Sequence, residues 1–372
     1  MKLTLIGPTY PYRGGIAHYT YYLDQALQAS GIETQVISFK RQYPGWLYPG
    51  SSDKDPSQNI LQTKADFVLD PLYPWTWLKA VQDIKTWNAE AVIFQWWTTF
   101  WGIPFAYISS KLKHYGMSIS FIIHNVLPHE QKPYDKFLAK FALSKGDYFI
   151  TQTIRQKEIL LTMLPDACVK VCAFPIYPGL KETKITKLEA RNKLSLPEQS
   201  KILLFFGIVR PYKGLEILLN AISALKNEGI NAYTIIAGEF WGELDYYQSR
   251  INELGLTEHI YIDNRYIPNE EADLYFSAAD FLIVPYVDGT QSAVVGLGFG
   301  YDIPMIVSEK AAEGIADDQK SFVTIVPTGD VLALSQAIRT SLTNPKNINP
   351  KTEFSFTGWE CIIKALVGFK KQ

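Results

Sequence analysis

An uninterrupted apolar run near the middle of the chain constrains the fold more than any other segment. Residues 202–206 read ILLFF, and Gly207 follows directly. Such a run without polar alternation is typical of a strand buried on both faces, as in a parallel sheet covered by helices. Arg210 and Lys213 come next, and Gly214 precedes a segment whose leucines and isoleucines recur at helical spacing. The segment therefore predicts a strand, a basic turn and a helix.

The basic turn is a candidate anion site. In an open α/β sheet, ligands bind outside the carboxyl ends of the strands, and a helix N-terminus beside two cations favours a negative charge. We therefore expect Arg210 and Lys213 to bind a group such as a diphosphate. Taken alone, such a turn is more often a pair of solvated surface cations, because exposed cations are common.

The whole chain repeats this strand and helix rhythm, which predicts an α/β protein with doubly wound sheets. A chain of 372 residues is too long for one ordinary core, so we expect two α/β domains, residues 1–173 and 174–353. The segment 173–199, with three prolines and many charges, is the predicted linker. The predicted strands are 3–7, 33–39, 91–94, 119–123, 147–151, 202–206, 233–237, 260–262, 281–286 and 304–307.

Two more turns after predicted strands have the character of phosphate-binding loops. Gly14 and Gly15 end a loop before a predicted helix, where glycines let backbone amides approach a ligand; the alternative is a plain tight turn. Gly289 to Ser292 form a small polar turn, with Ser292 the expected N-cap of the next helix. The turn at residues 289–292 and the basic turn after strand 202–206 both lie in the second half of the chain, and two phosphate-type turns in one predicted domain support each other.

His124 directly follows the predicted strand 119–123, at the expected ligand crevice. A histidine there suits contact with a sugar hydroxyl or a departing charge, although a lone histidine is more often structural.

The aromatic run 95–101 is expected to pack in the core, with stacking on a sugar or lipid acceptor as the alternative.

Charge and cysteine content limit the remaining classes. The net charge of −1 argues against a nucleic-acid binder. Residues 1–165 hold 16 Lys and Arg against 12 Asp and Glu, an excess that suits contact with anionic lipid or an anionic acceptor but is so small that chance accounts for it more readily. Cys168, Cys172 and Cys361 lack zinc-site spacing and are predicted to be buried thiols in a reducing compartment. No signal-peptide core or run of 18 apolar residues is present, so we expect a cytoplasmic protein, peripheral at most to the inner face of a membrane.

Several motifs together resemble glycosyltransferase family 4, the retaining glycosyl transferases group 1 enzymes of GT-B fold. The likeness runs along nearly the whole chain. It is carried by GPTYPYRGG, HNVLPHE, FFGIVRPYKG, IIAGEFWGE, YIPNEEADLYFSAAD and VPYVDGTQSAVVG.

This resemblance implies two Rossmann-like domains facing across a cleft, the first binding a hydroxyl acceptor and the second a nucleotide sugar, with a last helix within 354–372 crossing back to the first domain. It further implies transfer of a hexose without a metal or other cofactor, in polysaccharide or glycolipid synthesis, by front-face attack aided by the leaving phosphate. The residues in positions matching the family's catalytic groups are His124, Arg210 and Lys213. Those matching its donor-binding groups are Gly14, Gly15, Gly207, Glu239, Tyr266, Ile267, Thr290, Gln291 and Ser292.

The chain departs from the family pattern at one pair of positions. Two glutamates seven residues apart usually lie near the donor, but Gly289 and Leu297 occupy those positions here, as in a subset of the family with a TQS turn. The spacing from Arg210 to Lys213 is also shorter than the commonest pattern. Two alternatives to a transferase therefore remain: a protein that binds a nucleotide sugar without catalysis, and a nucleotide-sugar epimerase.

Overall fold

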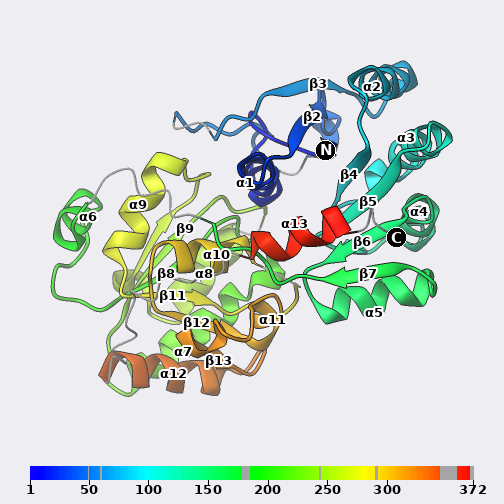
Figure 1. The fold of residues 1–372 in the computed structure, drawn as a ribbon. Helices are drawn as coiled ribbons and strands as arrows, with labels where there is room; N and C mark the ends of the chain where they lie inside the picture. The colour runs from blue at the N-terminus through cyan, green and yellow to red at the C-terminus, as the bar shows by residue number, and fades with distance from the viewer. Residues whose placement is uncertain are drawn as a thin grey trace. The chain divides into compact units, whose positions relative to one another are not determined.

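The computed structural model describes residues 1–48, 50–58, 61–128, 130–177, 185–242, 244–289, 292–343 and 358–368. The chain forms two compact units, each with its own parallel sheet (Figure 1). Unit 1 comprises Met1–Asp55, Ile60–Ala173 and Phe356–Gln372, and unit 2 comprises Pro56–Asn59 and Phe174–Ser355. The predicted class of two parallel α/β domains is confirmed. Segment 56–59 belongs to unit 2, whereas the predicted division placed it in the N-terminal domain. A hydrogen bond joins it to unit 2, since the backbone N–H of Asn269 donates to Ser57 Oγ at 2.9 Å.

Unit 1 has a seven-stranded sheet in the order β3-β2-β1-β4-β5-β6-β7. Strand order reverses between β1 and β4, which is the switch point where ligands bind in such sheets. The strands are β1 (Lys2–Ile6), β2 (Glu33–Phe39), β3 (Ala65–Leu69), β4 (Ala91–Trp96), β5 (Ser118–Ile123), β6 (Tyr148–Thr151) and β7 (Cys168–Val171). The helices are α1 (Gly15–Ala29), α2 (Pro74–Trp87), α3 (Gly102–His114), α4 (Asp135–Leu143), α5 (Ile154–Met163) and α13 (Trp359–Gly368).

Unit 2 has a six-stranded sheet in the order β10-β9-β8-β11-β12-β13, with its switch point between β8 and β11. The strands are β8 (Ile202–Phe206), β9 (Tyr233–Ala237), β10 (Ile260–Asp263), β11 (Phe281–Val284), β12 (Met305–Ser308) and β13 (Val323–Val326). The helices are α6 (Lys187–Lys193), α7 (Leu215–Asn227), α8 (Leu244–Glu253), α9 (Asn269–Ala278), α10 (Ala293–Gly300), α11 (Glu309–Ala312) and α12 (Val331–Thr343). The buried leucines of α7 are those whose spacing predicted it, since residues three and four apart share a face.

Large aromatic side chains fill the core of unit 1, as the sequence predicted for the run 95–101. Trp96 and Trp101 are fully buried and pack against Phe105. Trp46 and Trp75, in contrast, are 81% and 64% exposed. Within the described parts of the chain, no helix combines the length and the apolar character needed to cross a bilayer.

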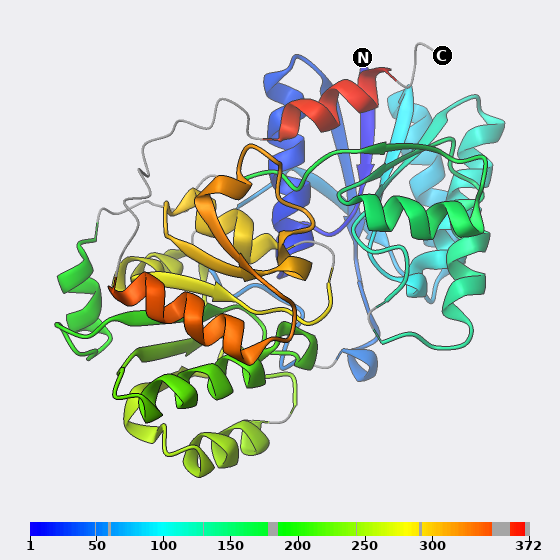
Figure 2. The same cartoon turned by 90° about the horizontal axis from the view of Figure 1, so that it is seen from below.

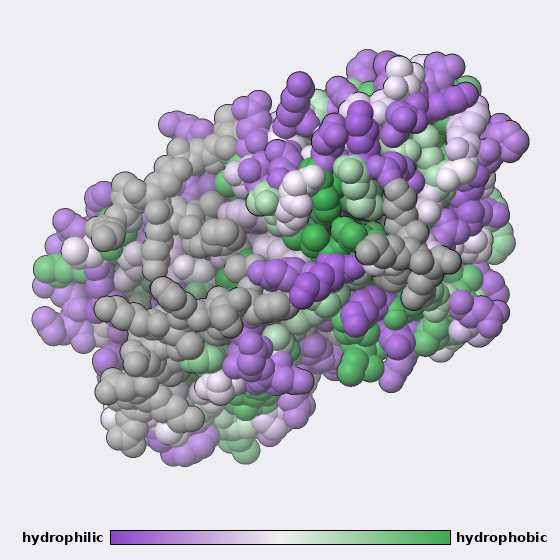
Figure 3. Space-filling model, viewed as in Figure 1, coloured by the Kyte–Doolittle hydropathy of each residue, from purple (hydrophilic) through white to green (hydrophobic). Residues whose placement is uncertain are grey.

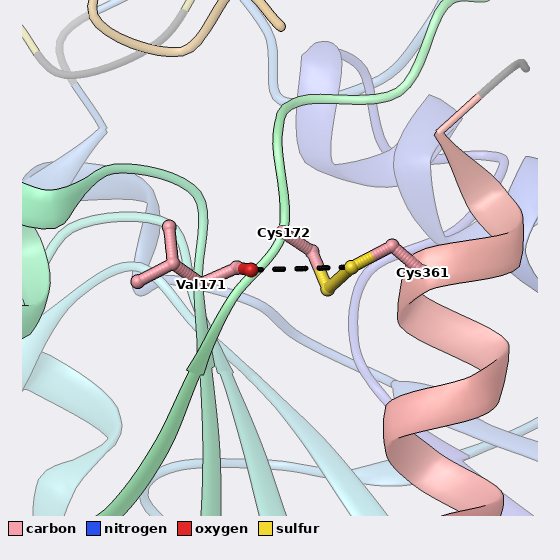
Figure 4. Close-up of a disulfide and its surroundings, with 3 residues drawn as sticks. All are labelled: Val171, Cys172 and Cys361. Carbon is pink, nitrogen blue, oxygen red and sulfur yellow. Dashed lines mark hydrogen bonds between the residues drawn. A yellow bond between two sulfur atoms is a disulfide. The ribbon is translucent and has the colours of Figure 1, made fainter.

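Helix α13 returns to unit 1 and lies beside α1 (Figures 1 and 2). A disulfide between Cys172 and Cys361 joins it to the end of β7, where the Val171 carbonyl oxygen lies 3.9 Å from Cys361 Sγ (Figure 4). Cys168 is free and exposed. The prediction of three buried thiols is therefore wrong, because two cysteines 189 residues apart in sequence meet in space.

Candidate functional site

The loops that follow β8 and β11 meet at the switch point of unit 2. The backbone N–H of Val287 donates to the Tyr212 carbonyl at 2.8 Å. Gly214 has a φ of 71°, and a Cβ added to it would lie 2.1 Å from the Pro285 carbonyl oxygen. Only glycine therefore allows this close approach between the two loops.

Lys213 occupies the centre of this junction. Its side chain is buried, at 7% exposed, and its ammonium lies 5.6 Å from the centroid of the Tyr286 ring. A Cβ added to Gly207 would come within 3.1 Å of Lys213 Nζ, so this glycine leaves the space that the ammonium occupies. Burial, and secondarily the charge of Arg210, lowers the pKa of Lys213 to about 7. An anion arriving at this point would favour the charged ammonium again.

The side chain of Arg210 contacts a residue that follows the neighbouring strand, β9. Its guanidinium stacks over the Trp241 ring, whose Nε1 donates to Glu239 Oε2 at 2.9 Å. The loops after β8 and β9 are joined by backbone hydrogen bonds, from Val209 N to the Glu239 carbonyl at 2.8 Å and from Trp241 N to the Val209 carbonyl at 3.2 Å. Gly238 is required at this contact, since its added Cβ would lie 2.2 Å from the Gly207 carbonyl oxygen.

Two helix N-termini open at the same switch point. Helix α7 starts after Gly214 without a side-chain cap in the described structure. Ser292 caps α10 as predicted, its hydroxyl accepting from Val295 N at 3.4 Å and donating to the Tyr286 hydroxyl at 3.3 Å. Burial raises the pKa of the Tyr286 phenol, so this group stays a neutral hydrogen-bonding partner. Helix N-termini beside two cations suit a phosphate group.

The other predicted donor residues of unit 2 are distributed more widely. Tyr266 and Ile267 follow β10, two strands away from β8, and Ile267 is buried in the core of the unit. Thr290 and Gln291 lie outside the described residues. The positions where the family has glutamates hold Gly289, with a φ of 119°, and Leu297, packed against the core.

Unit 1 carries the remaining predicted residues at its own switch point. Gly14, with a φ of 105°, precedes Gly15, the first residue of α1, and a Cβ added to Gly14 would meet no atom within 4 Å. His124 follows β5 and is buried, at 3% exposed, with its Nε2 2.6 Å from Gln95 Oε1. Burial lowers the pKa of His124 to about 3, so the imidazole is neutral at physiological pH.

The His124 ring also belongs to an aromatic chain. Tyr19 packs edge-on against it with centroids 4.7 Å apart, and the Tyr19 ring lies 5.0 Å from that of Trp359 on α13. The sequence did not single out Gln95, Tyr19 or Trp241 as site residues. The signal that reveals Gln95 and Trp241 is position, because each lies at the carboxyl end of a strand next to one already implicated.

No three His, Cys, Asp or Glu residues among those the structure describes are grouped so that they could hold a metal ion. The predicted site residues therefore form two groups, one in each unit. The group at the switch point of unit 2 contains Arg210, Lys213, Glu239 and Ser292, and the group in unit 1 contains Gly14, Gly15 and His124.

Known proteins resemble this chain in both sequence and fold. Residues 200–344 match the family described as Glycosyl transferases group 1. A D-inositol 3-phosphate glycosyltransferase from Stackebrandtia nassauensis is 26% identical over 133 residues, 34% of this chain. That match spans 28% of the relative's length.

Solved structures share the whole fold. Sucrose-phosphate synthase from Thermosynechococcus elongatus superposes with a TM-score of 0.71 at 18% identity, over 100% of this chain and 98% of that one. Anabaena Alr3699/HepE, in complex with UDP-glucose, gives a TM-score of 0.69 at 15% identity over the same shares. Residues 200–344 are therefore similar to the glycosyl transferases group 1 family, and the chain has the two-domain GT-B fold.

Proposed function

We propose that this protein is a retaining glycosyltransferase that moves a hexose from a nucleoside diphosphate sugar to a hydroxyl acceptor, in polysaccharide or glycolipid synthesis. The observation that carries the proposal is the buried Lys213 beside Arg210, at the switch point of a unit that matches the group 1 family. Two cations and two helix N-termini at one crevice fit a diphosphate better than any neutral ligand.

Glycosyl transfer from a nucleoside diphosphate sugar requires stabilisation of the departing diphosphate. Negative charge grows on the leaving group in the transition state, so fixed cations and backbone amides that meet it there lower the barrier. Lys213 and Arg210 supply the cations, and the starts of α7 and α10 supply amides. Thr290 and Gln291 are proposed to complete the phosphate contacts. This set of groups needs no metal, so we propose metal-independent transfer.

Unit 1 is proposed to present the acceptor and to contact the transferring sugar. Neutral His124 offers a hydrogen-bonding imidazole held by Gln95, which suits a sugar hydroxyl. Gly14 and Gly15 lie at the start of α1, where a Cβ added to Gly14 would meet no atom within 4 Å, so a ligand has room to approach the backbone. The UDP-glucose complex of the structurally similar Alr3699/HepE supports a sugar nucleotide as the donor class.

The absence of two carboxylates from the donor site favours a second candidate function, binding of a nucleotide sugar without transfer. Gly289 and Leu297 offer no carboxylate where the family has two glutamates that serve the donor. A protein that binds a nucleotide sugar without transferring it would have the same cationic site. An epimerase would also bind the donor, but it would release free nucleotide and an altered sugar without any acceptor.

The test begins with the donor. Purified protein is screened by thermal shift against UDP, GDP and ADP sugars, because a ligand held by the folded state raises the melting temperature. Donors that bind are then incubated with candidate hydroxyl acceptors, and the product is analysed by mass spectrometry and by NMR of its anomeric configuration. Transfer with retention supports the proposal. Binding without transfer or hydrolysis supports the binding protein, and a shift from no donor contradicts the donor site.

Lys213→Ala tests the assignment of the site itself. Loss of one charge-stabilising donor costs on the order of 3 kcal/mol in the barrier, about 100-fold in rate. Lys201→Ala is the matched control, since Lys201 is an exposed lysine just before β8. If Lys213→Ala keeps the turnover of the wild type, the proposed role of Lys213 is wrong.

A further inference from the structure

The first turn of α13 joins two elements of unit 1, α1 and β7. Trp359 packs on Tyr19 of α1, with ring centroids 5.0 Å apart. Cys361 forms the disulfide with Cys172, directly after β7 (Figure 4). Residues two apart in a helix point about 200° apart, so these two side chains leave the helix on nearly opposite sides. The disulfide therefore fixes the turn that carries Trp359.

Tyr19 extends this contact to the candidate site of unit 1. Its ring is fully buried and packs against the His124 ring, with centroids 4.7 Å apart and planes at 89°. Burial raises the pKa of the Tyr19 phenol, and the nearby Gln152 side chain lowers it only in part, so Tyr19 stays neutral. A continuous series of packed rings therefore runs from α13 to the imidazole.

The His124 ring needs support from its neighbours. The last torsion of a histidine side chain is broad and roughly two-fold, so surrounding groups decide where each ring nitrogen points. Gln95 Oε1 lies 2.6 Å from His124 Nε2 and can only accept, so Nε2 carries the ring proton. Tyr19 packs perpendicular to the ring and restricts its rotation. A ring held in this way presents the same nitrogen to every substrate.

We propose that Trp359 and Tyr19 are positioning residues for His124, which makes α13 a part of the unit 1 site. The disulfide is then a redox control on that site, because opening it frees the turn that carries Trp359. This inference rests on the proposed function, in which His124 contacts the transferring sugar. Misplacement of a contact group by about 1 Å costs up to about 100-fold in rate, so packing at a distance from the substrate affects turnover.

The disulfide is accessible to a reductant. Cys361 is only half-buried, and α13 lies on the face drawn in Figure 3, where hydrophilic residues are mixed with hydrophobic ones. One thiolate of a dithiol attacks a sulfur of the bond and forms a mixed disulfide, which the second thiol of the same reductant then resolves. Two electrons and two protons pass to Cys172 and Cys361, and the reductant becomes a disulfide.

The first measurement examines the His124 ring without any substrate. Full-length protein with isotope-labelled histidine is studied by long-range proton–nitrogen NMR, which distinguishes the two neutral tautomers, and His124→Asn identifies the signals. The wild type is expected to show one tautomer, with the proton on Nε2. Trp359→Leu and Tyr19→Leu should each give averaged or broadened signals. Tyr19→Phe keeps the ring and should keep the single tautomer.

Trp77→Leu is the matched control for the loss of a buried indole. Trp77 and Trp359 are 9% and 7% exposed, but the ring that packs on Trp77 is Tyr107 of α3. Trp77→Leu should lower the melting temperature and leave the His124 signals unchanged. Unchanged signals in both Trp359→Leu and Tyr19→Leu, or an equal change in Trp77→Leu, would overturn the positioning role.

The second measurement follows turnover with a donor identified by thermal shift. Trp359→Leu is expected to lower kcat by about tenfold or more, with the donor thermal shift unchanged because it reports unit 2. Dithiothreitol should lower the kcat of the wild type by about threefold or more and have no effect on Cys172→Ala with Cys361→Ala. Equal turnover of oxidised and reduced wild type would overturn the redox control. If the wild type transfers no sugar, the proposed function fails, whereas the NMR signals still decide whether α13 positions His124.

Discussion

The guanidinium carbon of Arg210 lies 5.3 Å from the centroid of the Trp241 ring. The indole in turn donates a hydrogen bond to Glu239, so a residue after β8 is positioned by two residues after β9. Stacking on an aromatic ring fixes the plane of a guanidinium while leaving its N–H groups available to an anion. Trp241 is thus a positioning residue for the cation that we assign to the diphosphate.

Trp241→Leu is expected to weaken binding of a nucleoside diphosphate by about threefold to tenfold, the range of a partly exposed cation–π contact. Isothermal titration calorimetry of the wild type, Trp241→Leu, Arg210→Ala and the double variant measures the coupling. If Trp241 acts through Arg210, the two losses do not add. Full additivity, or unchanged affinity in Trp241→Leu, would show that Arg210 does not depend on the indole.

Lys213 provides a prediction about protons. With a pKa lowered to about 7 by burial, its side chain is largely neutral at pH 8 in the free protein. A bound diphosphate favours the charged ammonium, so we expect binding at pH 8 to take up roughly one proton. Calorimetry in buffers of different ionisation enthalpy measures this uptake. Lys213→Met should abolish it, and uptake that persists in that variant would assign the proton to another group.

The central strands were predicted from the sequence, whereas of the four edge strands only β10 was predicted. The predicted strands 33–39, 202–206 and 233–237 are confirmed at both ends. The missed strands β3, β7 and β13 all lie at sheet edges, where one side lacks a neighbour. Their burial is mixed, so they lack the continuous apolar run that marks a strand covered on both faces.

Helix α6 was missed for a different reason. It lies in the segment 173–199, whose prolines and charges suggested a plain linker, yet Thr186 and Glu189 form a capping box at its start. That pattern of Thr followed three residues later by Glu was readable in the sequence.

The arrangement of the candidate site was predictable where its residues are close in sequence. Arg210 and Lys213 share one turn, and Ser292 caps the helix that its position suggested. Trp241 and Gln95 escaped prediction because they reach the site from adjacent strands. The order of parallel strands depends on long-range pairing, which no local pattern states. The Cys172–Cys361 bond was missed for the same reason.

The burial of His124 predicts how stability responds to acid. Its imidazole has a pKa lowered to about 3 by burial, whereas an unfolded histidine takes up a proton near pH 6.5. The unfolded chain therefore binds more protons between these values, and the free energy of unfolding falls as the pH drops from 6.5 towards 3. At pH 5 the loss from this residue is about 2 kcal/mol.

His124→Asn removes this titration, so its melting temperature should fall less than that of the wild type between pH 7 and pH 5. His114→Asn, at an exposed histidine at the end of α3, is the control and should keep the pH dependence of the wild type. An unchanged pH dependence in His124→Asn would mean that the imidazole is accessible to protons in the folded protein.

Gly214→Ala tests the contact between the two loops of the unit 2 switch point. The added Cβ would lie 2.1 Å from the Pro285 carbonyl oxygen, so one loop must move. Gly229 is a matched control with a φ of 77° and no atom within 4 Å of an added Cβ. Gly229→Ala should cost roughly 1–2 kcal/mol for its left-handed backbone, and Gly214→Ala clearly more. Equal shifts in urea midpoint for the two variants would show that the loops separate without cost.

The disulfide between Cys172 and Cys361 fixes α13 to unit 1, and it predicts both a thiol count and a change in stability. Protein purified without reductant and denatured should show one alkylated cysteine by mass spectrometry, Cys168, and three after reduction.

Replacing Cys172 and Cys361 by alanine should lower the free energy of unfolding by about 2 to 5 kcal/mol, because the open chain gains more conformational entropy than the cross-linked chain when it unfolds. It should also increase protease cleavage at α13, whose Trp359 otherwise packs on Tyr19. Cys168→Ala, at an exposed free cysteine, should leave both measurements unchanged. Three alkylated cysteines in the unreduced protein would mean that packing alone holds α13 on α1.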